Sequence, residues 1–198
     1  MPRRLSMEIV LQILIGVGLA ATCGFRVFVP LLVMGIAGLS GYLHLATGFE
    51  WIASLPALII FGIATVIEIA AYFIPYIDNL LDSISIPVSV IAGIIVAASV
   101  ITDVQPILRW TLAVIAGGGI ATVTSLISNG AHGVSTVASG GAANPAVSGA
   151  ESVLSVLASI MAIAVPVLAV SLLLVLLFVA FRVLRHDKNK RNNHRVSG

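Results

Sequence analysis

The chain has 198 residues, of which 59% are hydrophobic and only 9% are charged, and its formal net charge is +2. Its mean hydropathy is +1.15. A soluble domain is only about 45–50% apolar, so this composition excludes an ordinary soluble protein and predicts an integral membrane protein. Several apolar runs approach the ~20 residues that a helix needs to cross the hydrocarbon core. Their Ala, Leu, Ile and Gly content favours helices over an alternating barrel pattern.

We therefore predict an all-α fold, a polytopic transmembrane helical bundle with about six crossings, or alternatively seven. Residues 7–184 form a single transmembrane domain between a cytoplasmic N-terminus, residues 1–6, and a basic cytoplasmic tail, residues 185–198. The positive-inside rule supports this orientation, because six of the ten basic residues lie near the C-terminus, namely Arg182, Arg185, Lys188, Lys190, Arg191 and Arg195. We interpret the tail as a topology signal, so the predicted partner is the lipid bilayer and not nucleic acid.

The first apolar block, about residues 7–39, is too long for one crossing. Gly24-Phe25-Arg26 and Pro30 interrupt it, which indicates either two tightly joined helices or one broken helix with an arginine at the break. The next crossing runs from about Trp51 to Tyr72 and carries Glu68. Glu68 is either a proton- or cation-binding carboxylate or the ion-pair partner of Arg26.

Pro75 should end that helix. A short interfacial helix is expected over residues 76–84, with Asp78 and Asp82 together on its polar face. A linker helix follows over about 86–102 and closes at Asp103. Another helix begins at about residue 106, and its Gly117-Gly118-Gly119 run favours close helix packing over phosphate binding.

Small and polar residues dominate residues 128–150, which contain His132 and Asn144. This segment is too weakly apolar to face lipid, so it is buried among helices, re-entrant, or an external loop. The last apolar run, about 153–184, exceeds one span and contains Pro166. It is either a long tilted helix or a kinked one.

An internal duplication is indicated by two matches in one register. Glu50 matches Glu151 at an offset of 151 − 50 = 101 residues, and the same offset aligns Gly18-Leu19-Ala20 with Gly119-Ile120-Ala121. The repeats would cover about 7–75 and 106–184, and a short gap aligns Arg26 with His132. Each repeat would contain a broken or re-entrant piece that carries a base. Duplicated membrane proteins commonly place their site between the repeats.

A charged group inside a bilayer costs at least ~2.5–3.5 kcal/mol, so such groups usually face partners or water. Glu50 and Glu151 have a second interpretation as helix N-terminal caps, and His132 is expected to be a buried hydrogen-bonding side chain before a metal ligand. No metal site, cofactor or catalytic residue is predicted. The candidate residues for binding a substrate or ion are Arg26, Glu50, Glu68, His132, Asn144 and Glu151. The candidate structural residues are Pro30, Pro75, Asp78, Asp82 and Asp103.

The sequence favours a small transporter or channel-like permease for a small polar or anionic solute. Arg26 would hold an anionic group, and the glutamates would couple protons or cations. So short a chain lines a pathway poorly alone, which predicts a homo-oligomer. The alternatives are a membrane structural or assembly protein without transport and, with least support, a membrane-embedded lipid-modifying enzyme.

Three segments resemble a bacterial membrane family, number 4126 of the domain-of-unknown-function series. They are Gly18-Leu19-Ala20-Ala21-Thr22-Cys23-Gly24-Phe25-Arg26-Val27-Phe28-Val29-Pro30, Gly48-Phe49-Glu50-Trp51 and Pro75-Tyr76-Ile77-Asp78-Asn79-Leu80-Leu81-Asp82. The resemblance extends from about Gly16 to Pro166 and implies a multi-pass protein of the bacterial inner membrane. It carries no established binding residues. His132 stands where similar members have an arginine.

Overall fold

The computed structural model describes residues 2–71, 75–175, 177–178 and 182, with the side chains of residues 2–6 and 75–83 excepted. The predicted basic tail, residues 185–198, lies outside the described residues. The side chains of Asp78 and Asp82 also lie outside them, so their predicted shared polar face stays a prediction.

All the regular secondary structure in the described part is helical, which agrees with the predicted fold class. The helices in chain order are α1 Pro2–Cys23, α2 Phe28–Leu39, the 3-10 helix η1 Glu50–Ala53, α3 Leu55–Ala71, α4 Pro75–Val100, α5 Pro106–Leu112, the π-helix η2 Ala113–Gly118, α6 Gly119–Ser139 and α7 Asn144–Ala164. A further apolar helix covers Pro166–Val175.

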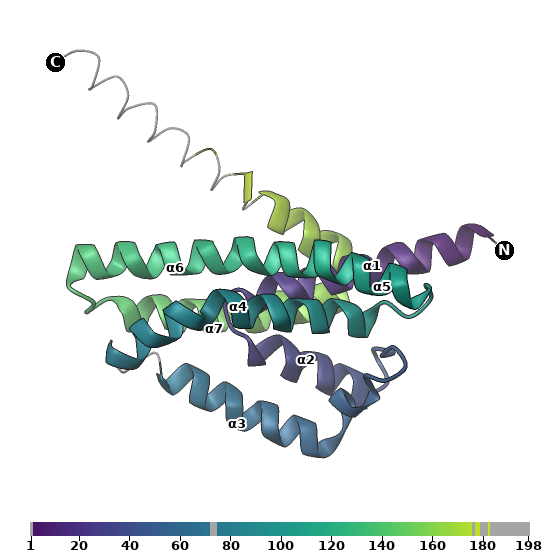
Figure 1. Ribbon diagram of the computed structural model, residues 1–198, viewed down its shortest axis with the longest axis horizontal. Helices are drawn as coiled ribbons and strands as arrows, with labels where there is room; N and C mark the ends of the chain where they lie inside the picture. The colour runs from purple at the N-terminus through teal and green to yellow at the C-terminus, as the bar shows by residue number, and fades with distance from the viewer. Residues whose placement is uncertain (1, 72–74, 176, 179–181, 183–198) are drawn as a thin grey trace, which may run out of the picture.

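Four long rods run along the molecule: α1, α4, the continuous α5–η2–α6 helix, and α7 (Figure 1). Helix α1 packs against α4, α6 and α7, whereas α2 and α3 pack on each other at one side of these rods. The buried core includes Leu19 of α1, Met34 of α2, Ile52 of η1 and Val96 of α4. The helix that begins at Pro166 turns back and leaves the bundle on the side away from α3.

Prolines mark most of the helix starts. A helix can begin with proline because its first amides have no intrahelical acceptor. Seven of the eight prolines lie within the first three residues of a helix, namely Pro2, Pro30, Pro56, Pro75, Pro106, Pro145 and Pro166. Helix α7 ends at Ala164 and the chain is helical again from Pro166, so the last apolar run is broken at Val165, and the alternative of one long tilted helix is wrong.

Two predicted helix boundaries are wrong. The interfacial helix over 76–84 and the linker helix over 86–102 form one helix, α4, with Pro87 inside it. An interior proline removes one backbone hydrogen bond and bends a helix without having to end it. The broken piece predicted around His132 in the second half is also absent, because α6 continues through His132 to Ser139. The Gly/Ser-rich segment is therefore a helical hairpin, which turns at Gly140 and Gly141 with φ of 63° and 89°.

The predicted close packing at the glycine run is confirmed at two of its three positions. A Cβ atom on Gly117 would lie 2.6 Å from the Ala97 Cβ atom and 2.7 Å from the Gly93 carbonyl oxygen. A Cβ atom on Gly118 would lie 3.0 Å from the Ile94 side chain, whereas a Cβ atom on Gly119 would meet nothing within 4 Å. Gly117 therefore lets η2 and α4 touch backbone to backbone.

The exposed surface has the character of a membrane protein. Two described helices are long and apolar enough to cross a membrane, Pro106–Ser139 and Asn144–Ala164, and five shorter apolar helices accompany them. The outer face of α3 is a row of exposed aliphatic side chains, among them Ile59, Ile63 and Val66. A continuous apolar face of this kind is suited to lipid and not to water. The number of crossings stays a prediction.

Candidate functional site

The chain breaks between α1 and α2 where α1 meets α6. After Cys23 the amides of Gly24 and Arg26 donate to the carbonyl oxygens of Ala21 and Thr22, so the last turn of α1 is closed tightly. Gly24 has no room for a side chain, because a Cβ atom there would collide with Thr124 of α6. The predicted break with an arginine is confirmed, and this close approach directs Arg26 into the bundle.

Arg26 is fully buried and binds one face of α7. Its exposed fraction is 0%. Its Nε donates to the Ser152 Oγ at 3.1 Å, and its Nη2 donates to the Ser148 carbonyl oxygen at 2.9 Å and to the Ser148 Oγ. The same Nη2 lies 3.6 Å from the Glu151 Oε2. Residues 148, 151 and 152 occupy one side of a helix, so the polar groups that bind the arginine all lie on one face of α7.

Glu151 connects this polar face of α7 to α6. Its Oε2 lies 3.1 Å from the His132 Nε2, and its Oε1 accepts a hydrogen bond from the Ser128 Oγ. Glu151 and His132 are 7% and 1% exposed. The two bases that the sequence alignment matched, Arg26 and His132, therefore contact the same carboxylate. We call Arg26, Ser128, His132, Ser148, Glu151 and Ser152 the Arg26 cluster.

Glu68 has a structural role in addition to the two predicted for it. Its carboxylate caps α2, because its Oε1 accepts from the Val27 amide at 2.7 Å and its Oε2 accepts from the Phe28 amide at 3.1 Å. A carboxylate at a helix N-terminus satisfies free amides and complements the helix dipole. Arg26 forms an ion pair with Glu151 and also interacts electrostatically with Glu68, so a direct ion pair between Arg26 and Glu68 stays a prediction.

A cavity of about 460 Å³ lies beside the break, bounded by α3, α4 and α6. Glu68 is the one charged side chain among its described lining residues. Its other polar lining residues are Ser85, Ser89, Ser128 and Asn129, and the remainder are small, aliphatic or aromatic. Ser128 also binds Glu151, so the cavity wall touches the Arg26 cluster.

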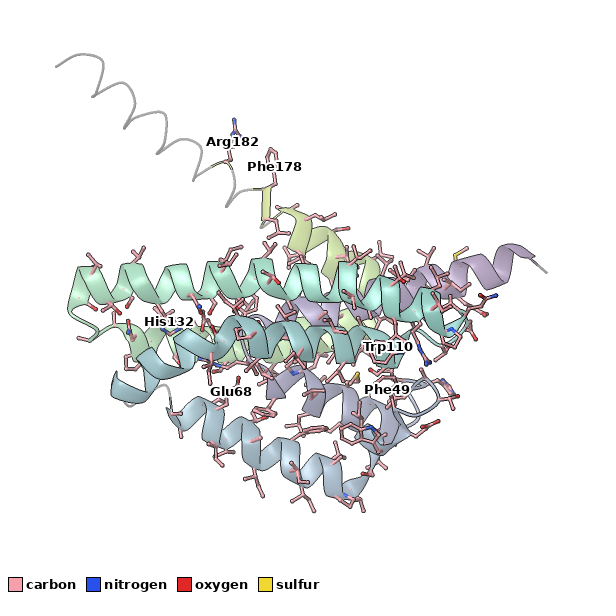
Figure 2. All side chains as sticks on the ribbon, viewed as in Figure 1. Phe49, Glu68, Trp110, His132, Phe178 and Arg182 are labelled. Carbon is pink, nitrogen blue, oxygen red and sulfur yellow. The ribbon has the colours of Figure 1, made fainter. Side chains whose placement is uncertain are left out.

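The remaining predicted site residues lie elsewhere. Glu50 is exposed and accepts a hydrogen bond from the nearby Gly48 amide. It follows Phe49, which lies at the opposite end of the bundle from His132 (Figure 2). The glutamate pair therefore does not form one site, because Glu50 is exposed at the start of η1 and Glu151 is buried within α7.

Asn144 and Asp103 each hold helices together. Asn144 donates from its Nδ2 to the Thr136 Oγ1 at 2.9 Å and so fastens the α6–α7 turn. Asp103 follows the end of α4, where its Oδ2 accepts from the Gln12 Nε2 of α1 at 2.6 Å.

The serines of the Arg26 cluster were not predicted from the sequence. A signal for them exists, because Asn144, Ser148, Glu151, Ser155 and Ser159 recur every three or four residues, and all are buried on one face of α7. Ser159 donates to the Thr22 Oγ1 of α1 at 3.0 Å. A buried polar stripe on an otherwise apolar helix predicts helix–helix hydrogen bonds. Within the described part of the chain, no group of three or more His, Cys, Asp or Glu side chains is placed to hold a metal ion.

Neither the comparison with curated proteins nor the comparison with solved structures finds a match. A scan against protein-family models does find one, over residues 13–186, and its description is Domain of unknown function (DUF4126). The match covers most of the 198 residues, including the break at Arg26, the Glu68 cavity and the polar face of α7. The chain therefore belongs to the DUF4126 family.

Proposed function

We propose that this protein is a small helical membrane permease for small polar solutes, and that solutes pass through the cavity beside Glu68. The observation that carries the proposal is the cavity of about 460 Å³ with a carboxylate in its wall, at a break between two helices. Ionisable groups inside membrane segments are costly and usually serve a solute, ion or proton. Broken helices beside polar cavities are the usual binding sites of transporters.

The geometry does not favour the anionic solute that the sequence suggested. Arg26 would have to hold such a solute, but its guanidinium is 0% exposed and is directed to the serines and glutamate of α7. The Arg26 cluster instead supports the pathway by fixing the break in α1–α2 against α6 and α7. The solute class of this proposal is therefore polar or cationic.

The proposed setting follows the sequence and the family. We place the protein in the bacterial inner membrane with its C-terminus in the cytoplasm, about six crossings, and two or more copies together. The apolar outer face of α3 supports contact with lipid or with another copy.

Replacing Glu68 with glutamine tests the pathway, because glutamine keeps the size of the side chain and can still accept one amide hydrogen bond. A hydrogen bond to a charged group contributes about 1.5–3 kcal/mol, so we expect uptake to fall about tenfold or more. The measurement is uptake of labelled glycerol, urea and tetramethylammonium into proteoliposomes. Glu50→Gln is the matched control, since Glu50 is exposed at the start of η1, and it should transport like the parent protein.

Equal uptake by the Glu68→Gln variant and the parent would remove Glu68 from the pathway. A second function, a structural or assembly protein of the membrane, is favoured by the Arg26 cluster alone, because its groups bind one another and are buried. That function predicts no uptake of any probe above empty liposomes, together with partner proteins that co-purify in fixed ratio.

A further inference from the structure

We infer that the cavity beside Glu68 binds a monovalent organic cation with an apolar body. This inference deepens the proposed function, on which it rests, by naming the solute class. Three properties of the cavity carry it: an excess of carboxylates over arginines around Glu68, unused acceptor positions on its carboxylate, and apolar walls of suitable size.

The charge balance favours a cation. Two buried or half-buried carboxylates, Glu68 and Glu151, share one arginine, since Arg26 forms an ion pair with Glu151 and also interacts electrostatically with Glu68. His132 also contacts Glu151, so a proton on its imidazole would offset the charge of Glu151 and not directly that of Glu68. Among the described residues that line the cavity, no basic side chain faces Glu68. A cationic ligand would supply the missing partner, and a carboxylate in low-dielectric surroundings gains most from such a partner.

The Glu68 carboxylate can accept further hydrogen bonds. A carboxylate offers about four acceptor positions, and the described bonds from the Val27 and Phe28 amides use two of them. Those two bonds also fix the direction of the carboxylate. An ammonium group could therefore bind without breaking the cap of α2.

The cavity walls fit an apolar body attached to the cation. Phe25 and Phe28 line the cavity on the side of the break, and Ile67, Ile84 and Val88 line it from α3 and α4. Aromatic faces also attract cations. The volume of about 460 Å³ lies within the roughly 300–1,000 Å³ of small-molecule sites. A bare metal ion would leave these walls unused.

Equilibrium dialysis of the purified full-length protein in detergent tests the site with three probes of similar size: benzyltrimethylammonium, benzyl alcohol and phenylacetate. We expect saturable binding of the cation, weaker binding of the alcohol, and no binding of the anion. Glu68→Gln should weaken cation binding at least tenfold and weaken binding of the alcohol by a smaller factor, because the alcohol loses a hydrogen bond to a charged group but no ion pair. Glu50→Gln should bind all three probes like the parent protein.

A second variant keeps the test sharp if Glu68→Gln folds poorly. Ala64→Phe adds bulk to the cavity wall without changing its charge, so it should weaken binding of benzyltrimethylammonium more than binding of tetramethylammonium. Equal cation binding by the parent and Glu68→Gln proteins, or preference for phenylacetate, would overturn the cation site. Cation binding without uptake into proteoliposomes would overturn the proposed permease and leave the cation site standing. Glycerol uptake without cation binding would overturn the cation site and leave the proposed permease standing.

Discussion

Replacing Arg26 with methionine is expected to destabilise the protein by about 3–5 kcal/mol, because it leaves Glu151 buried without its cationic partner. Methionine keeps most of the side-chain length, so the loss is mainly electrostatic. We expect little monodisperse protein in size-exclusion chromatography after mild heating in detergent. Arg109→Met is the control, since Arg109 is half-buried and lies over the Phe49 ring at 5.9 Å. A half-buried contact of that kind contributes about 0.5–2 kcal/mol.

The double variant Arg26→Met with Glu151→Gln separates charge from packing. If the ion pair is the main term, the double variant should be less destabilised than the sum of the two single variants, because neither charge is left alone. Additive losses would mean that each side chain acts through separate contacts, such as those of Arg26 with Ser148 and Ser152.

Replacing Gly117 with leucine is the second change with a large expected effect. The Cβ atom alone would lie 2.7 Å from the Gly93 carbonyl oxygen and 2.6 Å from the Ala97 Cβ atom, so η2 and α4 must separate. Overpacking typically costs about 1–3 kcal/mol, and a full leucine side chain at a backbone contact should reach the upper end of that range. The temperature at which half of the detergent-solubilised protein aggregates measures the loss.

Gly119→Leu is a control only two residues away on the same continuous helix. Gly119 is exposed, and a Cβ atom there meets nothing within 4 Å. Replacing a helical glycine also relieves its cost of about 0.5–1 kcal/mol, so this variant should aggregate at the same temperature as the parent or a higher one. Equal losses in both variants would show that the α4 contact is not the cause.

The sequence predicted the helices well and their continuity less well. Prolines and glycines within the apolar runs indicated the break at Arg26, the interruption near Pro166 and the close contact at Gly117. The errors concern Pro87 and His132, since α4 continues through the proline and α6 through the histidine. Local sequence indicates where a helix can stop, whereas packing against neighbouring helices decides whether it does.

The sequence predicted which residues form the site better than it predicted which of them contact one another. The sequence indicates Arg26, Glu68, His132 and Glu151 as charged or polar groups in apolar segments, but it does not predict the ion pair of Arg26 with Glu151. The true partner of Arg26 depends on how α7 is rotated, and that rotation is set by the buried stripe of Asn144, Ser148 and Ser155. The match between Glu50 and Glu151 in sequence does not reveal that Glu50 is exposed at the start of η1.

The uneven burial of α3 determines which part of the cavity wall can move most easily. Its described buried residues, Ala57 and Phe61, both lie in its first half, so few core contacts hold the second half, which carries Glu68. Segments with few buried contacts open at the lowest free energy. The two hydrogen bonds that the Val27 and Phe28 amides donate to Glu68 therefore tie this weakly packed half of α3 to the start of α2.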